Sequence, residues 1–144
     1  PGTPLSELQR KLNHLAQEVF NVRSKKQMHR QRHIVRQIDQ YIAEHLSGDL
    51  SLTAIADALH FHPTYISRVY RECSSVSFSD SIAQSRLKKA CSLLSETDQS
   101  IASIAEQTGF NTANYFARWF RKWMGCTAQE YRERSQDHLY LSPL

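Results

Sequence analysis

The sequence predicts an all-α chain: two helix-turn-helix units joined by a long linker helix and preceded by an N-terminal amphipathic helix. Three observations predict this fold. One helical pattern occurs twice, an apolar heptad opens the chain, and apolar residues elsewhere recur at helical spacing, without the alternation typical of strands. The predicted boundaries are 1–28 for a coiled-coil-like helix and connector, 29–95 for the first unit with its linker helix, and 96–144 for the second unit and C-terminal tail.

The repeated pattern covers two helices and the turn between them. Residues 55–57, 61 and 65–71 return as residues 104–106, 110 and 115–121. The offset is 49 residues up to the phenylalanine and 50 from the tyrosine onward, so the second copy holds one extra residue. Two such units offer two similar helices to a partner that itself repeats, and duplex DNA is such a partner.

Apolar residues near the N-terminus are spaced 3, 4, 3, 4 and 3 residues apart. They are Leu5, Leu8, Leu12, Leu15, Val19 and Val22. This spacing is typical of a coiled-coil seam over about three heptads, which predicts dimerisation through these residues. Over so short a length, a helix that packs on its own domain explains the spacing equally well, and both interpretations stay open.

A basic segment follows the heptad and interrupts its spacing. It contains Arg23, Lys25, Lys26, Arg30, Arg32 and Arg36, with no acid among them. We interpret it as a connector whose charges form a solvated helical face more readily than a phosphate-binding surface. The formal net charge of +4 permits nucleic-acid binding. Because residues 49–134 hold ten Lys and Arg against nine acids, DNA binding there requires local clustering of basic residues.

The first unit begins with an amphipathic helix whose apolar residues are Ile34, Val35, Ile38, Ile42 and Leu46. This helix should end at residues 47–49. Ser51 is a predicted N-cap for a short helix through Leu59, and Pro63 suits the first turn of the next helix. His60 occupies the tight turn between them, where a positive φ is expected.

A linker helix of about 16 residues, roughly 24 Å long, should start near residues 77–80. Added to the width of the flanking units, that length places the second helix of each unit, the recognition helix, about one DNA turn, or 34 Å, from the other. In the second unit Ser100 is a predicted cap, and Asn111 or Thr112 caps the recognition helix. Residues 127–130 form a capping box for a last short helix through Tyr131.

The apolar residues of both recognition helices recur at helical spacing and should form each unit's core. They are Tyr65, Ile66, Val69 and Tyr70 in the first unit, and Tyr115, Phe116, Trp119 and Phe120 in the second.

From residue 34 to residue 134, the chain resembles the DNA-binding domain of AraC/XylS-type bacterial transcription regulators. The similarity is densest from residue 101 to residue 132 and rests on a long composite motif. Its residues are 100–101, 104–106, 109–110, 115–122, Gly125, Thr127 and 131–132. Three positions depart from the family pattern: Ala128 replaces proline, Cys126 replaces an apolar residue and His60 replaces a turn glycine.

The resemblance implies which side chains contact DNA. The implied base contacts are Thr64, Ser67 and Arg68 in the first unit, and Ala113, Asn114, Ala117 and Arg118 in the second. Arginine can pair with guanine, asparagine can pair with adenine, and methyl groups can touch thymine, although Asn114 could equally be an ordinary surface residue. Arg71, Arg121 and Lys122 lie one turn further on, where we expect phosphate contacts.

The expected function is therefore sequence-specific binding of double-stranded DNA at an asymmetric promoter site, usually for activation. RNA polymerase is an expected partner, a cytoplasmic location is expected, and a homodimer through the N-terminal helix is possible. Residues 1–28 are too few for a ligand pocket, so an effector or signal domain is expected to be missing from this chain. The alternative function is a helical protein-protein adaptor that uses the heptad stripe.

Other function classes find no support in the sequence. No catalytic constellation or cofactor motif is present, and the pairs His29/His33 and His60/His62 lack further metal ligands in a known spacing. The three cysteines have no metal-type spacing and are expected to be reduced structural thiols. No apolar run approaches the roughly 20 residues that a membrane helix needs.

Overall fold

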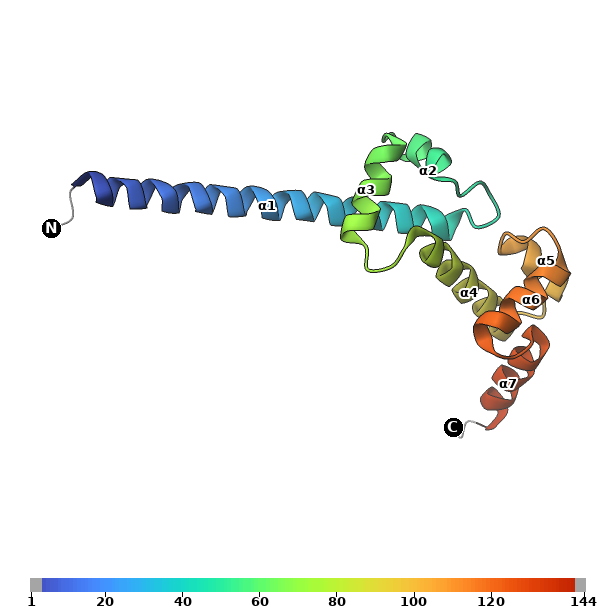
Figure 1. Cartoon of the computed structure of the whole chain (residues 1–144). Coiled ribbons are helices and arrows are strands. Elements are labelled where there is room, and N and C mark those ends of the chain that lie inside the picture. Colours follow the sequence, from blue (N-terminus) through green and yellow to red (C-terminus); the bar gives the residue numbers. More distant parts are fainter. Residues whose placement is uncertain (1–3, 142–144) are drawn as a thin grey trace.

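The computed structural model describes residues 4–141, and within this range the chain forms seven helices and no strand. In order they are α1 (Pro4–Glu44), α2 (Leu52–Leu59), α3 (Pro63–Cys73), α4 (Phe78–Glu96), α5 (Ile101–Gln107), α6 (Ala113–Met124) and α7 (Ala128–Leu141). Figure 1 shows α1 as a long rod with α2 and α3 at its C-terminal end, and α4 leading to a second unit of α5, α6 and α7. The predicted all-α arrangement is confirmed.

The first helix, α1, is one continuous element of 41 residues. At 1.5 Å per residue it is about 62 Å long. The basic segment expected to be a connector lies inside it, so the heptad and the first core helix are a single rod and not two helices. This segment contains no Gly or Pro and is rich in Arg, Lys and Gln, all good helix formers, which explains why the helix continues through it.

The first unit packs α2 and α3 on the C-terminal part of α1. Ile34, Ile38 and Ile42 follow one another at intervals of four residues and form the buried stripe of α1. They share a core with residues of the two following helices and of the intervening turns: Leu46, Leu50, Ile55, Ala56, Ile66, Val69 and Tyr70.

The turn inside each helix-turn-helix unit has the same hydrogen bonds. In the first unit the amides of His60 and Phe61 donate to α2 carbonyls at 3.3 and 2.9 Å. In the second unit the amides of Gly109 and Phe110 donate to α5 carbonyls at 3.1 and 2.9 Å. His60 has a φ of 62° and Gly109 a φ of 91°, so the predicted left-handed turn is confirmed in both.

Helix caps also lie where the sequence predicts them. Ser51, Ser77, Ser100 and Thr112 each accept a hydrogen bond from the backbone amide three residues later. Thr112, and not the alternative Asn111, is thus the cap of α6. The capping box is present as well: Thr127 Oγ1 accepts from the Glu130 amide at 3.1 Å, and the Glu130 carboxylate accepts from the Thr127 amide at 3.4 Å.

Two helices are longer than predicted. The linker helix α4 has 19 residues against an expected 16 or so, and α7 extends to Leu141 instead of stopping near Tyr131. In the second unit, Ala90 and Leu94 of α4 are fully buried against Ile104 of α5 and the two buried phenylalanines of α6. The three cysteines are free thiols: Cys126 is buried, and Cys73 and Cys91 are half-buried.

The prediction that Tyr115 belongs to the core is wrong. The Tyr115 side chain is 55% exposed, whereas its counterpart Tyr65 is half-buried against the first core. The covering helices differ: α1 packs closely along α3, whereas α4 packs on α7, α1 and α5 and comes close to α6 at few positions. Trp119 is half-buried, and the remaining predicted core residues of both recognition helices are buried.

Candidate nucleic-acid interface

The recognition helix of the first unit, α3, has one buried and one solvent-facing side. The predicted readers lie at intervals that put them on one helical face: Thr64, Arg68 and Arg71 are exposed and Ser67 is half-buried. The opposite face holds the buried core residues of this helix. The start of α3 is fixed locally, because Pro63 is its first residue and His62 Nδ1 accepts a hydrogen bond from the Thr64 amide at 3.2 Å.

The recognition helix of the second unit, α6, is divided in the same way into an apolar and a polar face. Phe116 and Phe120 are fully buried, and the half-buried Ala113 packs against the same core. The remaining predicted contact residues are exposed: Asn114, Ala117, Arg118, Arg121 and Lys122.

The basic side chains on the two helices are free of carboxylate partners. The ion pairs within residues 4–137, whose side chains the structure describes, are His14–Glu18 and Arg134–Glu130, and neither involves α3 or α6. The Arg68 guanidinium lies 5.6 Å from the centre of the Tyr65 ring, a cation–π contact between two residues of α3. Two faces with unpaired arginines therefore supply the local positive charge that the nearly neutral repeat requires for DNA.

Hydrogen bonds from α1 and α4 fix the position of α3. The Tyr70 hydroxyl donates to Asp39 Oδ1 of α1 at 2.8 Å, and the Ser81 hydroxyl of α4 donates to the same oxygen at 3.2 Å. Burial raises the pKa of Tyr70 above its usual value, so its hydroxyl stays a donor at neutral pH. No local sequence pattern predicts this three-helix junction, because the partners are 31 and 42 residues apart.

Aromatic packing fixes the position of α6. Phe116 meets Phe110 edge-on with 5.3 Å between ring centres, and Phe120 meets Tyr131 of α7 edge-on at 5.8 Å. Arg132 of α7 donates through Nε to the Leu94 carbonyl at 3.1 Å and so ties α7 to the end of α4.

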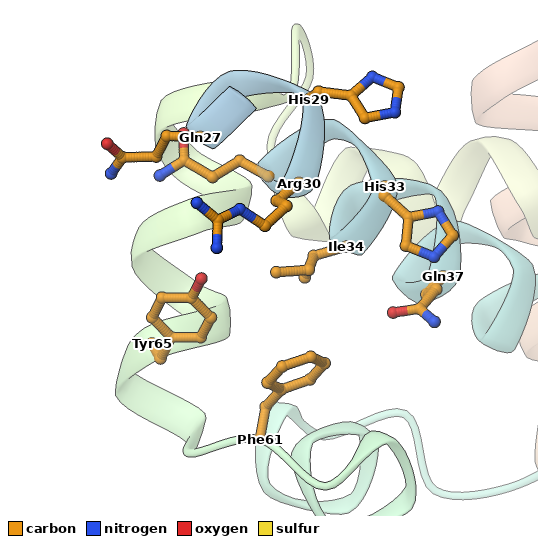
Figure 2. Close-up of a pocket in the computed structure, with 9 residues that line it drawn as sticks. Gln27, His29, Arg30, His33, Ile34, Gln37, Phe61 and Tyr65 are labelled. Atoms are coloured by element: carbon orange, nitrogen blue, oxygen red, sulfur yellow. The ribbon is translucent and has the colours of Figure 1, made fainter. Parts of the chain in front are cut away.

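A hollow of about 790 Å³ lies beside α3, between α1 and the turn of the first unit. Figure 2 shows Ile34, Phe61 and Tyr65 around it, with Arg30 above the Tyr65 ring and His33 and Gln37 on the other side. No predicted site residue lines it. Its sequence signal was weak, since its residues come from the basic part of α1 and from the turn.

The predicted dimerisation residues lie on the free N-terminal part of α1, which extends away from the helical body (Figure 1). All six are exposed, with fractions from 51% for Val19 to 77% for Leu5: Leu5, Leu8, Leu12, Leu15, Val19 and Val22. The open alternative, in which this stripe packs on its own domain, is not what the structure shows. Within residues 4–141, no element covers this apolar stripe.

Two other kinds of site are absent from the described part of the chain. Residues 4–137, whose side chains the structure describes, contain no cluster of three or more His, Cys, Asp or Glu able to hold a metal ion. No helix within residues 4–141 has the length and apolar character needed to span a membrane.

Comparison with known proteins gives a family match over most of the two units. A family model described as a helix-turn-helix domain matches residues 55–134. The regulatory protein PocR of Salmonella typhimurium is 34% identical over 99 residues, which cover 69% of this chain and 33% of PocR. The chain thus spans about a third of the length of this relative.

Solved structures agree with this match. The C-terminal domain of AraT, a response regulator from Geobacillus stearothermophilus, is 38% identical with a TM-score of 0.63, over 70% of this chain and 84% of that one. A DNA-binding transcriptional dual regulator from Escherichia coli K-12 is 27% identical with a TM-score of 0.66, over 72% and 93% of the two chains.

Proposed function

The chain belongs to the AraC-type family of helix-turn-helix transcription regulators, and we propose that it inserts α3 and α6 into adjacent major-groove segments of one promoter site. In this proposal Arg68 and Arg118 donate to guanine edges, while Arg71, Arg121 and Lys122 hold phosphates. Regulation by activation, contact with RNA polymerase, and action in the cytoplasm are further parts of the proposal. They rest on the family alone.

One observation carries the proposal: both recognition helices bury an apolar stripe and present an exposed basic one, at equivalent positions of a repeated unit. Arg68 and Arg118 correspond to each other in the repeat, and both are exposed without a carboxylate partner. An isolated basic helix would fit any polyanion. Two equivalent helices held by a 19-residue linker fit a partner with a repeating groove.

The test is selection of bound duplexes from a random DNA pool with the wild-type chain, Arg68→Ala and Arg118→Ala. Each substitution should relax selectivity in a different part of the site, by about 1–3 kcal/mol if the guanidinium contacts a base edge. Lys89→Ala is the matched control, because Lys89 is an exposed basic residue on the linker helix, outside both recognition helices. Uniform weakening on all duplexes would reassign that arginine to a phosphate.

A second proposal concerns the exposed heptad of α1, for which we infer pairing with the same helix of a second copy. The six side chains are each at least half exposed and follow coiled-coil spacing on a straight, unbroken helix. Sedimentation should show a monomer–dimer equilibrium that Leu12→Asp shifts to monomer. Asn13→Asp, which adds the same charge beside the seam, should leave the equilibrium nearly unchanged. A wild-type chain that stays monomeric at high concentration would contradict the pairing.

The same surface supports the alternative of a protein-protein adaptor. That function predicts no sequence-selective DNA binding and no steep loss of affinity with salt. A salt titration of duplex binding therefore separates the two functions. An affinity that is weak and the same for every duplex would favour the adaptor.

A further inference from the structure

The turn of the second helix-turn-helix unit makes a close backbone contact with the first unit. Gly109, in the turn of the second unit, lies against the carbonyl group of Leu46, which follows α1 in the first unit. A Cβ atom at position 109 would overlap the Leu46 carbonyl oxygen and would lie 3.1 Å from the carbonyl carbon. The chain can therefore approach this closely only with glycine here. Leu46 itself is 5% exposed, so this contact joins the second turn to the first core.

Arg86 of the linker helix α4 fills the space beside this contact. Its guanidinium carbon lies 5.4 Å from the centre of the Phe110 ring, and Nη2 lies 3.4 Å from where a Gly109 Cβ would be. Nε is buried and makes no hydrogen bond within the described chain. Burial lowers the pKa of this guanidinium from its usual value, and the charge is held in place by an aromatic ring and backbone, not by a carboxylate.

In the first unit, the position that corresponds to Arg86 holds an apolar residue, Ile34. Ala90 and Leu94 of α4 are fully buried in the second core as Ile38 and Ile42 of α1 are in the first, which makes Arg86 the counterpart of Ile34. Ile34 faces the hollow that Phe61 and Tyr65 also line, as Figure 2 shows. In the second unit, the guanidinium of Arg86 covers Phe110, the counterpart of Phe61.

From these contacts we propose that Arg86 is a positioning residue that sets the spacing between the two DNA subsites. It joins the linker helix to the turn of the second unit at the place where that turn rests on the first unit. The relative position of α3 and α6 then depends on this joint as well as on the length of α4. This inference rests on the proposed function, because spacing has meaning only if both helices enter one duplex.

Spacing on DNA is a sensitive readout of such a joint. One inserted base pair moves the second subsite by about 3.4 Å along the duplex axis and about 35° around it. A rigid pair of helices cannot satisfy both displacements at once. If the two helices can move relative to each other, a wrong spacing lowers the affinity less, because both helices can still bind the same duplex at once.

The experiment compares wild type, Arg86→Met and Arg86→Lys on duplexes with the selected spacing, with one base pair more, and with one fewer. Arg86→Met keeps most of the side-chain length and removes the guanidinium. Wild type should bind the altered spacings at least about tenfold more weakly, and Arg86→Met should reduce this ratio by about threefold or more while binding to a single-subsite duplex is unchanged. Lys88→Met, an exposed change on the same helix, should behave as wild type.

A second measurement needs no DNA. Residual dipolar couplings of backbone amides should fit one alignment tensor for both units in the wild type and in Lys88→Met, but require two in Arg86→Met. If Arg86→Met fails to fold, Arg86→Lys carries both tests, since it keeps the charge and loses the planar stack on Phe110. An unchanged spacing ratio together with a single tensor would overturn the inference. A wild-type chain without any spacing preference would instead refute the proposed insertion of both helices.

Discussion

The contact between Gly109 and Leu46 predicts that alanine at position 109 destabilises the fold, and the same substitution at two other glycines provides the comparison. Gly109→Ala adds a methyl group at a φ of 91°, and this methyl overlaps the Leu46 carbonyl oxygen. Gly125→Ala adds the same group at a φ of 76°, with no atom within 4 Å. Gly48→Ala adds it outside the left-handed region, at an ordinary distance of 3.5 Å from the His45 carbonyl oxygen. The three variants separate backbone strain from steric overlap.

The expected sizes follow from these geometries. Left-handed strain should lower the free energy of unfolding by about 1–2 kcal/mol in Gly125→Ala. Gly109→Ala carries the same strain and also forces packed backbone apart, which adds about 1–3 kcal/mol and gives a total of about 2–5 kcal/mol. Gly48→Ala should be neutral or stabilise by up to about 1 kcal/mol, because alanine reduces the freedom of the unfolded chain.

Urea unfolding followed by far-UV circular dichroism measures these differences directly. For a chain of this size about 1 kcal/mol corresponds to roughly 3–5 °C in Tm, so thermal scans should rank the variants in the same order. Equal destabilisation of Gly109→Ala and Gly125→Ala would mean that the Leu46 carbonyl does not overlap a methyl group at position 109. The contact between the two units would then not exist as described.

Three further results are expected from single positions. His60→Gly should raise the free energy of unfolding by about 1 kcal/mol in urea denaturation, since His60 has a φ of 62° that glycine adopts without strain; an unchanged midpoint would contradict this. Phe116→Ala should lower it by about 3–5 kcal/mol, whereas Tyr115→Ala, which truncates a half-exposed ring, should have a clearly smaller effect in the same assay. Burial raises the pKa of the Cys91 thiol, so at about pH 8, with Cys73 and Cys126 replaced by serine, it should react with a disulfide reagent more slowly than free cysteine.

Local chemistry explains which parts of the fold could be predicted from the sequence. Ser51, Ser100 and Thr127 each need only neighbouring residues to cap a helix, and all three do so in the structure. The positive φ at His60 follows from its correspondence with a glycine in the second copy. The division of α3 and α6 into buried and exposed faces follows from helical periodicity alone.

The sequence patterns predict two features wrongly and give no sign of two others. The apolar stripe of α1 stops at Val22 and resumes at Ile34 roughly a third of a turn around the helix, and the basic residues between them, which the sequence predicts to be a connector, are helical. The repeat predicts Tyr115 in the core as the counterpart of Tyr65, but α4 comes close to α6 at few positions, unlike α1 along α3. The contacts of Asp39 with Tyr70 and of Arg86 with Phe110 join residues distant in sequence, and no local pattern predicts them.

The continuity of α1 has a mechanical consequence for the two recognition helices. Ile38 and Asp39 belong to the same unbroken helix as the exposed heptad, and they hold α3 through the first core and through the Tyr70 hydrogen bond. A rotation of α1 on pairing with a second copy would therefore reach α3 without a flexible joint. It would reach α6 only through α4, the contact of Arg86 with Phe110 and the contact of Gly109 with Leu46. Dimerisation should accordingly orient the first recognition helix directly. In Arg86→Met, dimerisation should still affect binding at the first DNA subsite but no longer at the second.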